Sequence, residues 1–383
     1  MKIVVAIDSF KGSLSSLEAG TAIKNGIHLV DTHADIHICP LADGGEGTVD
    51  ALIQALGGKK HFLQVTGPLG EQTEAQYGIL SDQRTAVLET AAAAGLTLVP
   101  AEKRNPFLTT SFGIGEIIKD AISYGCRQFI IGLGGSATND GGIGMLQALG
   151  FELLDSAGQP VPFGAKGLES LTAISDRNVI PELADCQFQI ACDVKNPLYG
   201  DNGCSYVFGP QKGASPAMAD KMEQWMYRYA QVVKKAYPEK AQPLFPGTGA
   251  AGGLGFAFLT FTNATLTSGI QIILEQIGAE AFIRDADLII TGEGKLDEQT
   301  AMGKAPMGIA SLAKKYGKPV IAFSGCASHN ARICNRYGID AFFPILRSPC
   351  TLAEAMKKEI AAQNLTDTAE QVYRLWQLCQ KGL

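Results

Sequence analysis

The chain has 383 residues, of which 46% are hydrophobic and 18% charged, a composition that supports large hydrophobic cores and excludes a wholly disordered protein. Its 32 Lys and Arg against 38 Asp and Glu give a net charge of −6, which argues against nucleic acid or an anionic membrane as a partner. The sequence shows no signal peptide, no apolar stretch long enough to span a membrane and no Cys-x-x-Cys pair among its nine cysteines, so we expect a cytoplasmic protein with reduced thiols.

The first 57 residues predict two strand–loop–helix units. Short apolar runs at 3–7 and 36–41 are typical of buried parallel strands, and each precedes a loop with glycine and a carboxylate. Ser15 and Glu18 are spaced as a capping box at the start of the first helix, where Leu17, Ile23 and Ile27 mark the predicted buried face. The second helix is expected to stop at Gly57.

The middle of the chain follows a different pattern. Residues 61–65 and 74–80 flank a Gly-Pro turn and predict an antiparallel hairpin. Beyond it we expect helices at 111–124 and 218–237 and strands at 129–133 and 188–192.

The C-terminal third shows the same alternation of strands and helices as the first 57 residues. Strands are expected at 287–291, 319–324 and 341–346, with helices between and after them. Two N-terminal units cannot bury a parallel sheet alone, so they are expected to join the C-terminal units. The sequence therefore predicts an α/β fold. A doubly wound parallel-sheet domain at 1–57 plus 286–383 is interrupted by an inserted mixed α/β domain at 58–285, which carries a glycine-rich phosphate loop.

Five loops combine glycines with carboxylates or hydroxyls, at residues 8–13, 42–48, 132–142, 247–255 and 292–297. Glycine lets backbone N–H groups approach an anion closely, and a following helix N-terminus adds partial positive charge. Ligands of open α/β sheets bind at the carboxyl ends of strands. We therefore expect these loops to face one interdomain cleft.

The loop at 132–142 is the richest, with five glycines, two hydroxyls, an amide and the carboxylate of Asp140. A plain strand-to-helix turn needs fewer glycines. Backbone and hydroxyl groups suit phosphate oxygens, and a carboxylate suits Mg²⁺, so the loop predicts a polyphosphate site with a divalent cation.

The same loop also supports a rival interpretation. Gly132-x-Gly134-x-x-Ala137 follows a predicted strand and matches the dinucleotide fingerprint, with Asp155 about twenty residues further on. An NAD-dependent hydroxy-acid dehydrogenase therefore stays as the alternative. A non-catalytic binder of organic acids is a third hypothesis. The Walker, protein-kinase, serine-hydrolase and zinc-protease motifs are absent from the sequence.

Several blocks together resemble the bacterial type I glycerate kinase family. They are Asp8-Ser9-Phe10-Lys11 and the segments 42–48, 132–142, 192–197, 208–213 and 291–294. The resemblance implies transfer of the γ-phosphoryl group of ATP to D-glycerate, usually yielding 2-phosphoglycerate, by a flavodoxin-like domain interrupted by an insertion. A 3-phosphoglycerate product and a homodimer stay open.

Side-chain chemistry assigns roles within such a kinase. Phosphate binding is predicted for Gly134, Gly135, Ser136, Thr138 and Asn139, and Mg²⁺ binding for Asp140 and Glu293. Glycerate binding is predicted for Asp8, Lys11, Asn196 and Lys212. Asp193, or alternatively Asp43, would accept the proton of the substrate hydroxyl, and Lys11 or Lys212 would offset negative charge.

Overall fold

The computed structural model describes residues 1–380 and divides into two compact units. Unit 1 comprises Met1–Asp43, Asp50–Ala55 and the chain from Ile270 onward, and unit 2 comprises Gly44–Val49 and Leu56–Gly269. Helices α10 (Gly269–Gln276) and α11 (Ala279–Asp285), which the sequence assigns to the insertion, thus lie in unit 1 apart from Gly269.

Unit 1 is built on a five-stranded parallel sheet in the order β13-β12-β11-β1-β2. Its strands are β1 (Lys2–Val5), β2 (Asp35–Ile38), β11 (Leu288–Leu296), β12 (Val320–Ala327) and β13 (Ala341–Pro344). Numbered within the unit, this is the flavodoxin-like order 2-1-3-4-5, so the predicted fold is confirmed. The chain leaves β1 toward β2 and resumes on the other side of β1, which makes the β1–β11 junction the topological switch point.

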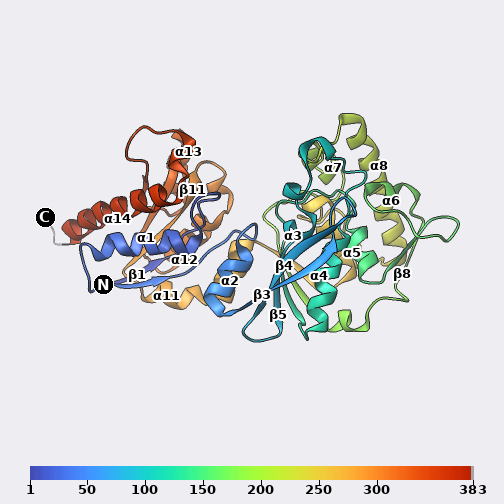
Figure 1. Cartoon of the computed structure of the whole chain (residues 1–383), viewed down its shortest axis with the longest axis horizontal. Coiled ribbons are helices and arrows are strands. Elements are labelled where there is room, and N and C mark those ends of the chain that lie inside the picture. The colour runs from blue at the N-terminus through green and yellow to red at the C-terminus, as the bar shows by residue number, and fades with distance from the viewer. Residues whose placement is uncertain (381–383) are drawn as a thin grey trace. The chain divides into compact units, whose positions relative to one another are not determined.

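Helices cover both faces of this sheet. Helices α1 (Ser16–His28) and α14 (Lys358–Gln380) lie side by side (Figure 1) and share one core with the strands, including Ile3, Ile23 and Leu365. Helix α12 (Ala305–Lys315) packs on β11 and α11 on β1. The other helices that contribute to unit 1 are α2 (Thr48–Leu56) and α13 (Leu352–Ala355).

Two local predictions in unit 1 have clear outcomes. The capping box of Ser15 and Glu18 is present. Leu17, predicted to be buried, is 38% exposed, because it lies off the helix face formed by Ala19, Ile23 and Ile27 at intervals of four residues.

Strand β11 also differs from its prediction. It continues to Leu296 rather than ending at Thr291, since its pairing with β12 extends to Leu296 opposite Ala327. Glu293 therefore lies on a strand and not in a loop.

Unit 2 contains a six-stranded mixed sheet in the order β10-β9-β6-β5-β4-β3. The strands are β3 (Gly58–Thr66), β4 (Gln72–Leu80), β5 (Thr85–Glu89), β6 (Gln128–Gly132), β9 (Gln187–Ala191) and β10 (Ala264–Thr267). β3 and β4 form the predicted antiparallel hairpin, whereas β5, β6, β9 and β10 are parallel. A separate ribbon joins β7 (Glu152–Leu154) to β8 (Ala173–Ser175).

The helices of unit 2 pack around one large core that contains Phe129, Phe188 and Phe258. They are α3 (Ala91–Ala94), α4 (Phe112–Ser123), α5 (Ile143–Ala148), α6 (Ala165–Ser170), α7 (Cys204–Phe208), α8 (Pro216–Ala236) and α9 (Leu254–Phe261). Strand β6 and helix α5 therefore bracket the glycine-rich loop at 133–142.

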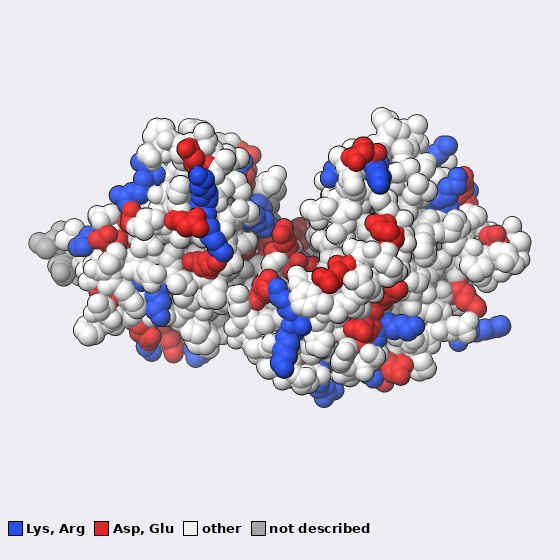
Figure 2. Space-filling model, in the orientation of Figure 1, with Lys and Arg blue, Asp and Glu red and all other residues white. Residues whose placement is uncertain are grey.

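Charged side chains of both signs are intermingled on the drawn face of each unit (Figure 2). None of the helices within residues 1–380 combines the length and apolarity needed to cross a membrane.

Candidate active site

A row of polar residues lies at the carboxyl edge of the unit 1 sheet, on β11, on β12 and in the loop after β1. The Asp8 N–H donates to the carbonyl of Gly292 at 2.9 Å, which sets Asp8 beside Glu293 of β11, and Ser324 of β12 is the register partner of Glu293. Residues in register face the same side of a sheet. The row therefore lies at the β1–β11 switch point, where open α/β sheets bind ligands.

Two lysines and a hydroxyl lie beside the carboxylates of this cluster. The Lys11 Nζ lies 3.1 Å from Asp43, which follows β2. The Lys304 Nζ lies 3.6 Å from Glu293, and the Thr300 hydroxyl, in the short helix η6 (Thr300–Met302), donates to Glu293 at 2.5 Å. A separate ion pair of 3.3 Å joins Lys295 to Asp297.

The electrostatics of this cluster show an excess of negative charge. Burial, helped by Asp43 and opposed by Lys11, raises the pKa of Asp8 to about 7. Burial also raises the pKa of Glu293, which Thr300 and Lys304 offset only in part. Burial disfavours the Lys11 ammonium, but Asp43 and Asp8 outweigh that cost and raise its pKa.

The cluster fits a divalent cation on two grounds. A cation would compensate the excess negative charge, and the Thr291 and Ser324 hydroxyls beside Glu293 are fully buried without a hydrogen-bond partner among the described residues. Residues 1–380 bring no three His, Cys, Asp or Glu side chains together in a metal-binding arrangement. Mg²⁺, however, commonly takes only one or two protein carboxylates and completes its shell with water and phosphate.

The glycine loops of unit 2 pack backbone against backbone. A Cβ placed on Gly132 would lie 2.0 Å from the carbonyl oxygen of Gly44, and one on Gly252 would lie 2.2 Å from that of Thr138. The Gly141 N–H donates to the carbonyl of Gly252 at 2.9 Å. The loops at 44–48, 132–142 and 247–255 are thus brought together, and only glycine permits these contacts.

The turn at 134–136 differs from the rest of its loop. Gly134 and Gly135 are exposed, and Gly135 adopts a left-handed φ of 71°. The N–H groups of Gly134, Gly135 and Ser136 donate to no acceptor among residues 1–380. Successive unpaired N–H groups around a left-handed residue form an anion-binding nest.

Lys212 lies directly beneath this turn. It belongs to the short helix η4 (Pro210–Lys212), is 2% exposed, and donates to the Ser136 hydroxyl at 3.1 Å and to the Thr138 carbonyl at 2.5 Å. No carboxylate of the described chain forms an ion pair with it. Burial lowers the pKa of Lys212 to about 8, although Cys204 and Asp140 act in the opposite direction.

Asp140 is fully buried and occupied by its own loop. Its carboxylate accepts hydrogen bonds from the Ser111 N–H at 2.9 Å and hydroxyl at 2.8 Å, and from the N–H groups of Gly142 at 3.1 Å and Gly144 at 3.4 Å. Burial raises its pKa against these four donors. The contacts hold the start of α5 to the start of α4.

The other predicted residues of unit 2 fall into two environments. Thr138 and Asn139 are fully buried beneath the turn, and the Asn139 amide donates to Ser205 at 3.1 Å. Asp193 is exposed at the end of β9 and accepts from the Gly269 N–H at 3.1 Å. The half-buried Asn196 donates to the carbonyl of Asn202 at 2.8 Å.

The structure therefore sorts the predicted residues into two sets. Asp8, Lys11, Asp43 and Glu293 gather in unit 1, and the remaining predicted residues lie in unit 2. Residues that the sequence did not single out complete the unit 1 set: Thr291, Thr300, Lys304 and Ser324. Of these four, only Thr291 lies in a block used for the resemblance, 291–294, and that block gave it no role.

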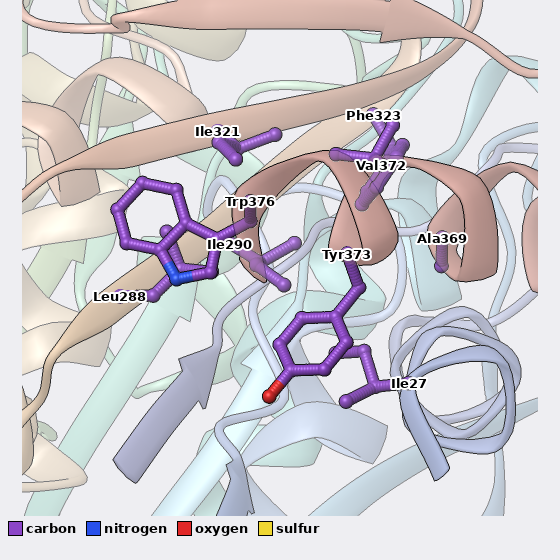
Figure 3. Close-up of a pocket in the computed structure, with 9 residues that line it drawn as sticks. All are labelled: Ile27, Leu288, Ile290, Ile321, Phe323, Ala369, Val372, Tyr373 and Trp376. Carbon is purple, nitrogen blue, oxygen red and sulfur yellow. The ribbon is translucent and has the colours of Figure 1, made fainter. Parts of the chain in front are cut away.

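A cavity of about 10 Å³ elsewhere in unit 1 is not a candidate site. Its lining is apolar, and the hydroxyl of Tyr373 turns away from it (Figure 3) to donate to Asp31 at 2.9 Å. The volume admits one water at most. It is a packing gap between α14 and the sheet.

Comparison with known proteins decides the family. The sequence model described as the glycerate kinase family matches residues 3–377. The chain is 49% identical to glycerate 2-kinase of Escherichia coli K12 over 93% of each protein, and 45% identical to glycerate kinase of Haemophilus influenzae over 98% of each.

The chain belongs to the glycerate kinase family. The fold is also similar to the crystal structure of a protein from Salmonella typhimurium LT2 described as glycerate kinase 2. The two share 45% sequence identity and a TM-score of 0.91, over 100% of this chain and 99% of that one. The resemblance read from the motifs is confirmed, and so is the prediction of a kinase.

The dehydrogenase hypothesis finds no support. The dinucleotide fingerprint requires its glycines to open a helix directly. Here residues 133–142 are irregular, and α5 begins only at Ile143. Asp155, the expected ribose ligand, instead accepts from the N–H groups of Ala157 and Gln159 in a turn.

Proposed function

We propose that this member of the glycerate kinase family transfers the γ-phosphoryl group of ATP to D-glycerate and yields 2-phosphoglycerate, with Mg²⁺ as cofactor. The observation that carries the proposal is the Gly134–Ser136 turn, in which both glycines are exposed and whose three unpaired N–H groups suit a phosphate. The choice of position 2 is supported by the name of the Escherichia coli relative, glycerate 2-kinase.

Only some of the residues predicted to bind phosphate can contact a ligand directly. Gly134 and Gly135 are exposed, and Ser136, although buried, directly follows them, whereas Thr138 and Asn139 are fully buried. Asp140 is saturated by four donors. We therefore assign it to holding the loop rather than the metal.

The unit 1 cluster would serve the cation and the acceptor. Glu293, with Asp8 beside it, would hold Mg²⁺, which supplies charge neutralisation at the phosphates when bound. Lys11 is exposed and positively charged, so it can meet the carboxylate of glycerate as a point charge. The sequence predicts that ATP and glycerate meet in an interdomain cleft, and this stays a prediction.

Two carboxylates stay as candidates for the base that accepts the hydroxyl proton. Asp193 is exposed and accepts a hydrogen bond from the Gly269 N–H, and Asp43 is paired with Lys11. Replacement of the true base by Asn should lower kcat by orders of magnitude while leaving ATP binding largely intact. Measuring both D193N and D43N therefore distinguishes them, and a wild-type rate removes that residue from the mechanism.

A coupled assay of ADP release tests the function itself. D-glycerate, L-glycerate, lactate and tartronate are compared as acceptors with Mg²⁺ and then with excess EDTA. We expect release that depends on both D-glycerate and Mg²⁺. ADP release that is indifferent to all four acids would refute the proposal.

The position of transfer has its own readout. In proton-coupled ³¹P NMR, phosphate on carbon 2 is split by one proton into a doublet, and phosphate on carbon 3 is split by two into a triplet. We expect the doublet. A triplet would keep the kinase and overturn the 2-phosphoglycerate product.

A further inference from the structure

We propose that Lys212 makes the Ser136 hydroxyl an obligatory donor to the nucleotide phosphate, so that phosphate binding at the Gly134–Ser136 turn requires a protonated lysine beneath it. The inference rests on the proposed ATP site and deepens it. Lys212 acts through Ser136 and is a positioning residue for the phosphates, not a ligand of glycerate.

The direction of the hydrogen bond between Lys212 and Ser136 follows from the donors and acceptors that each side chain has. A lysine ammonium has three donors and no acceptor, whereas a serine hydroxyl has one proton and two lone pairs. At 3.1 Å from Lys212, the Ser136 oxygen must accept. Its single proton is then directed elsewhere, and the described residues show only the bond from Lys212 at this hydroxyl, with no acceptor for its proton.

The groups next to the Ser136 hydroxyl are also hydrogen-bond donors, which suits an anion as the acceptor of its proton. Ser136 adjoins the exposed Gly134 and Gly135, whose N–H groups are also unpaired. The hydroxyl and the three N–H groups are therefore four donors within one turn, in which Gly134 and Gly135 are exposed and Ser136 is buried. Each hydrogen bond to a charged acceptor contributes about 1.5–3 kcal/mol.

Lys212 itself lacks a compensating charge. The groups around it are the Cys204 thiol of α7, whose pKa burial raises to about 12, and Asp140, whose hydrogen bonds go to its own loop. Glu223 of α8 bonds to the Gly200 N–H, and Arg104 presents its backbone to Gly213 after η4. A bound phosphate would supply the missing negative charge.

Deprotonation of Lys212 would reverse the direction of its hydrogen bond with the Ser136 hydroxyl. The neutral amine can accept, so Ser136 could donate to it and withdraw its proton from the phosphate. Since burial places the pKa of Lys212 near 8, binding above this pH must draw a proton from solvent. Phosphate affinity is thereby coupled to proton uptake.

Isothermal titration of the full chain with ATP and Mg²⁺ tests the coupling at pH 7.5 and 9.0, where ATP itself no longer titrates. We expect affinity to fall by about tenfold across this interval, and about half a proton to be taken up at pH 8 in buffers of different ionisation enthalpy. In K212M both effects should vanish, and in S136A the pH dependence should be reduced.

The variants K212M, S136A and the double mutant form a cycle. We expect the double mutant to bind ATP no more weakly than K212M, because both changes remove the same donor. K235Q, which removes an exposed lysine of α8, should behave as wild type.

Additive losses in the cycle, or wild-type pH dependence in K212M, would overturn the inference. S136A removes only one oxygen atom from a small buried side chain, so it provides an answer even if K212M folds poorly. Glycerate-dependent ADP release by the wild-type protein is a separate measurement. If ADP release occurs but ATP binding shows no pH coupling, only the inferred role of Lys212 is refuted. If ADP release is absent, the proposed function is refuted.

Discussion

Replacing Asp8 by Asn should stabilise unit 1 at neutral and alkaline pH. Asp8 is 3% exposed, and burial raises its pKa from 3.8 to about 7. Asn has nearly the same shape and can keep the hydrogen bond that Asp8 Oδ1 accepts from the Ser9 N–H at 2.7 Å. The variant therefore removes mainly the cost of a buried charge.

The size and sign of the effect follow from linkage. The unfolded carboxyl loses its proton near pH 4 and the folded one near pH 7, so the stability of the wild-type protein falls as pH rises between these values. A difference of about 3 pKa units corresponds to about 4 kcal/mol at full ionisation. The advantage of D8N should thus be small at pH 4 and grow by about 3–4 kcal/mol by pH 8.

Urea unfolding at several pH values measures this directly. The chain has two tryptophans, Trp225 in unit 2 and Trp376 in unit 1, so a W225F background leaves a reporter for unit 1 alone. This matters because two units need not unfold together. Measurements without Mg²⁺ or nucleotide keep the Asp8 carboxylate uncompensated.

A matched variant gives the opposite sign. The ion pair with Lys358 and the capping box lower the pKa of Glu18, so E18Q should lose stability above pH 4.5 and approach wild type at lower pH. If D8N is destabilised at every pH, or if its advantage does not change with pH, Asp8 is not a charge held at a cost, and the electrostatic account of the unit 1 cluster is refuted.

Three further substitutions test the backbone around the two sites. S16A removes a hydroxyl that bridges the loops after β1 and β2 and should cost about 1–3 kcal/mol in urea unfolding; an unchanged midpoint would contradict this. D140A leaves four buried donors unpaired and should lower the thermal midpoint by several degrees, whereas lost activity at an unchanged midpoint would restore a metal role. G132A should destabilise unit 2 through its clash with Gly44, while G134A, whose Cβ meets only a neighbouring Cα at 3.3 Å, should fold and weaken ATP binding; equal unfolding midpoints for the two would contradict this contrast.

Much of the fold could be predicted because it follows from local patterns. The short apolar runs of parallel strands, the capping box before α1 and the glycine after α2 each act within a few residues. The extension of β11 to Leu296 could not be seen, since it depends on pairing with β12, whose residues lie about thirty positions away. Sheet registers of this kind are set by tertiary packing.

The contacts of charged residues were harder to predict for the same reason. An aspartate among glycines suggests a metal ligand, yet the partner of Asp140 is Ser111, 29 positions earlier in the chain. Lys212 meets Ser136 across 76 positions. No sequence spacing distinguishes a buried lysine that orients a loop from an exposed one that binds an acid.

Glycine content alone is a poor guide to where a ligand binds, and unpaired N–H groups are a better one. Gly132 and Gly252 are required by the close approach of other backbone segments. Gly134 and Gly135 are instead exposed, are not closely approached by a backbone carbonyl, and carry N–H groups without acceptors among the described residues. A glycine-rich loop can therefore contain both kinds of position. The ligand should be sought only where exposure and unpaired donors coincide, which in the loop at 132–142 selects the turn above Lys212.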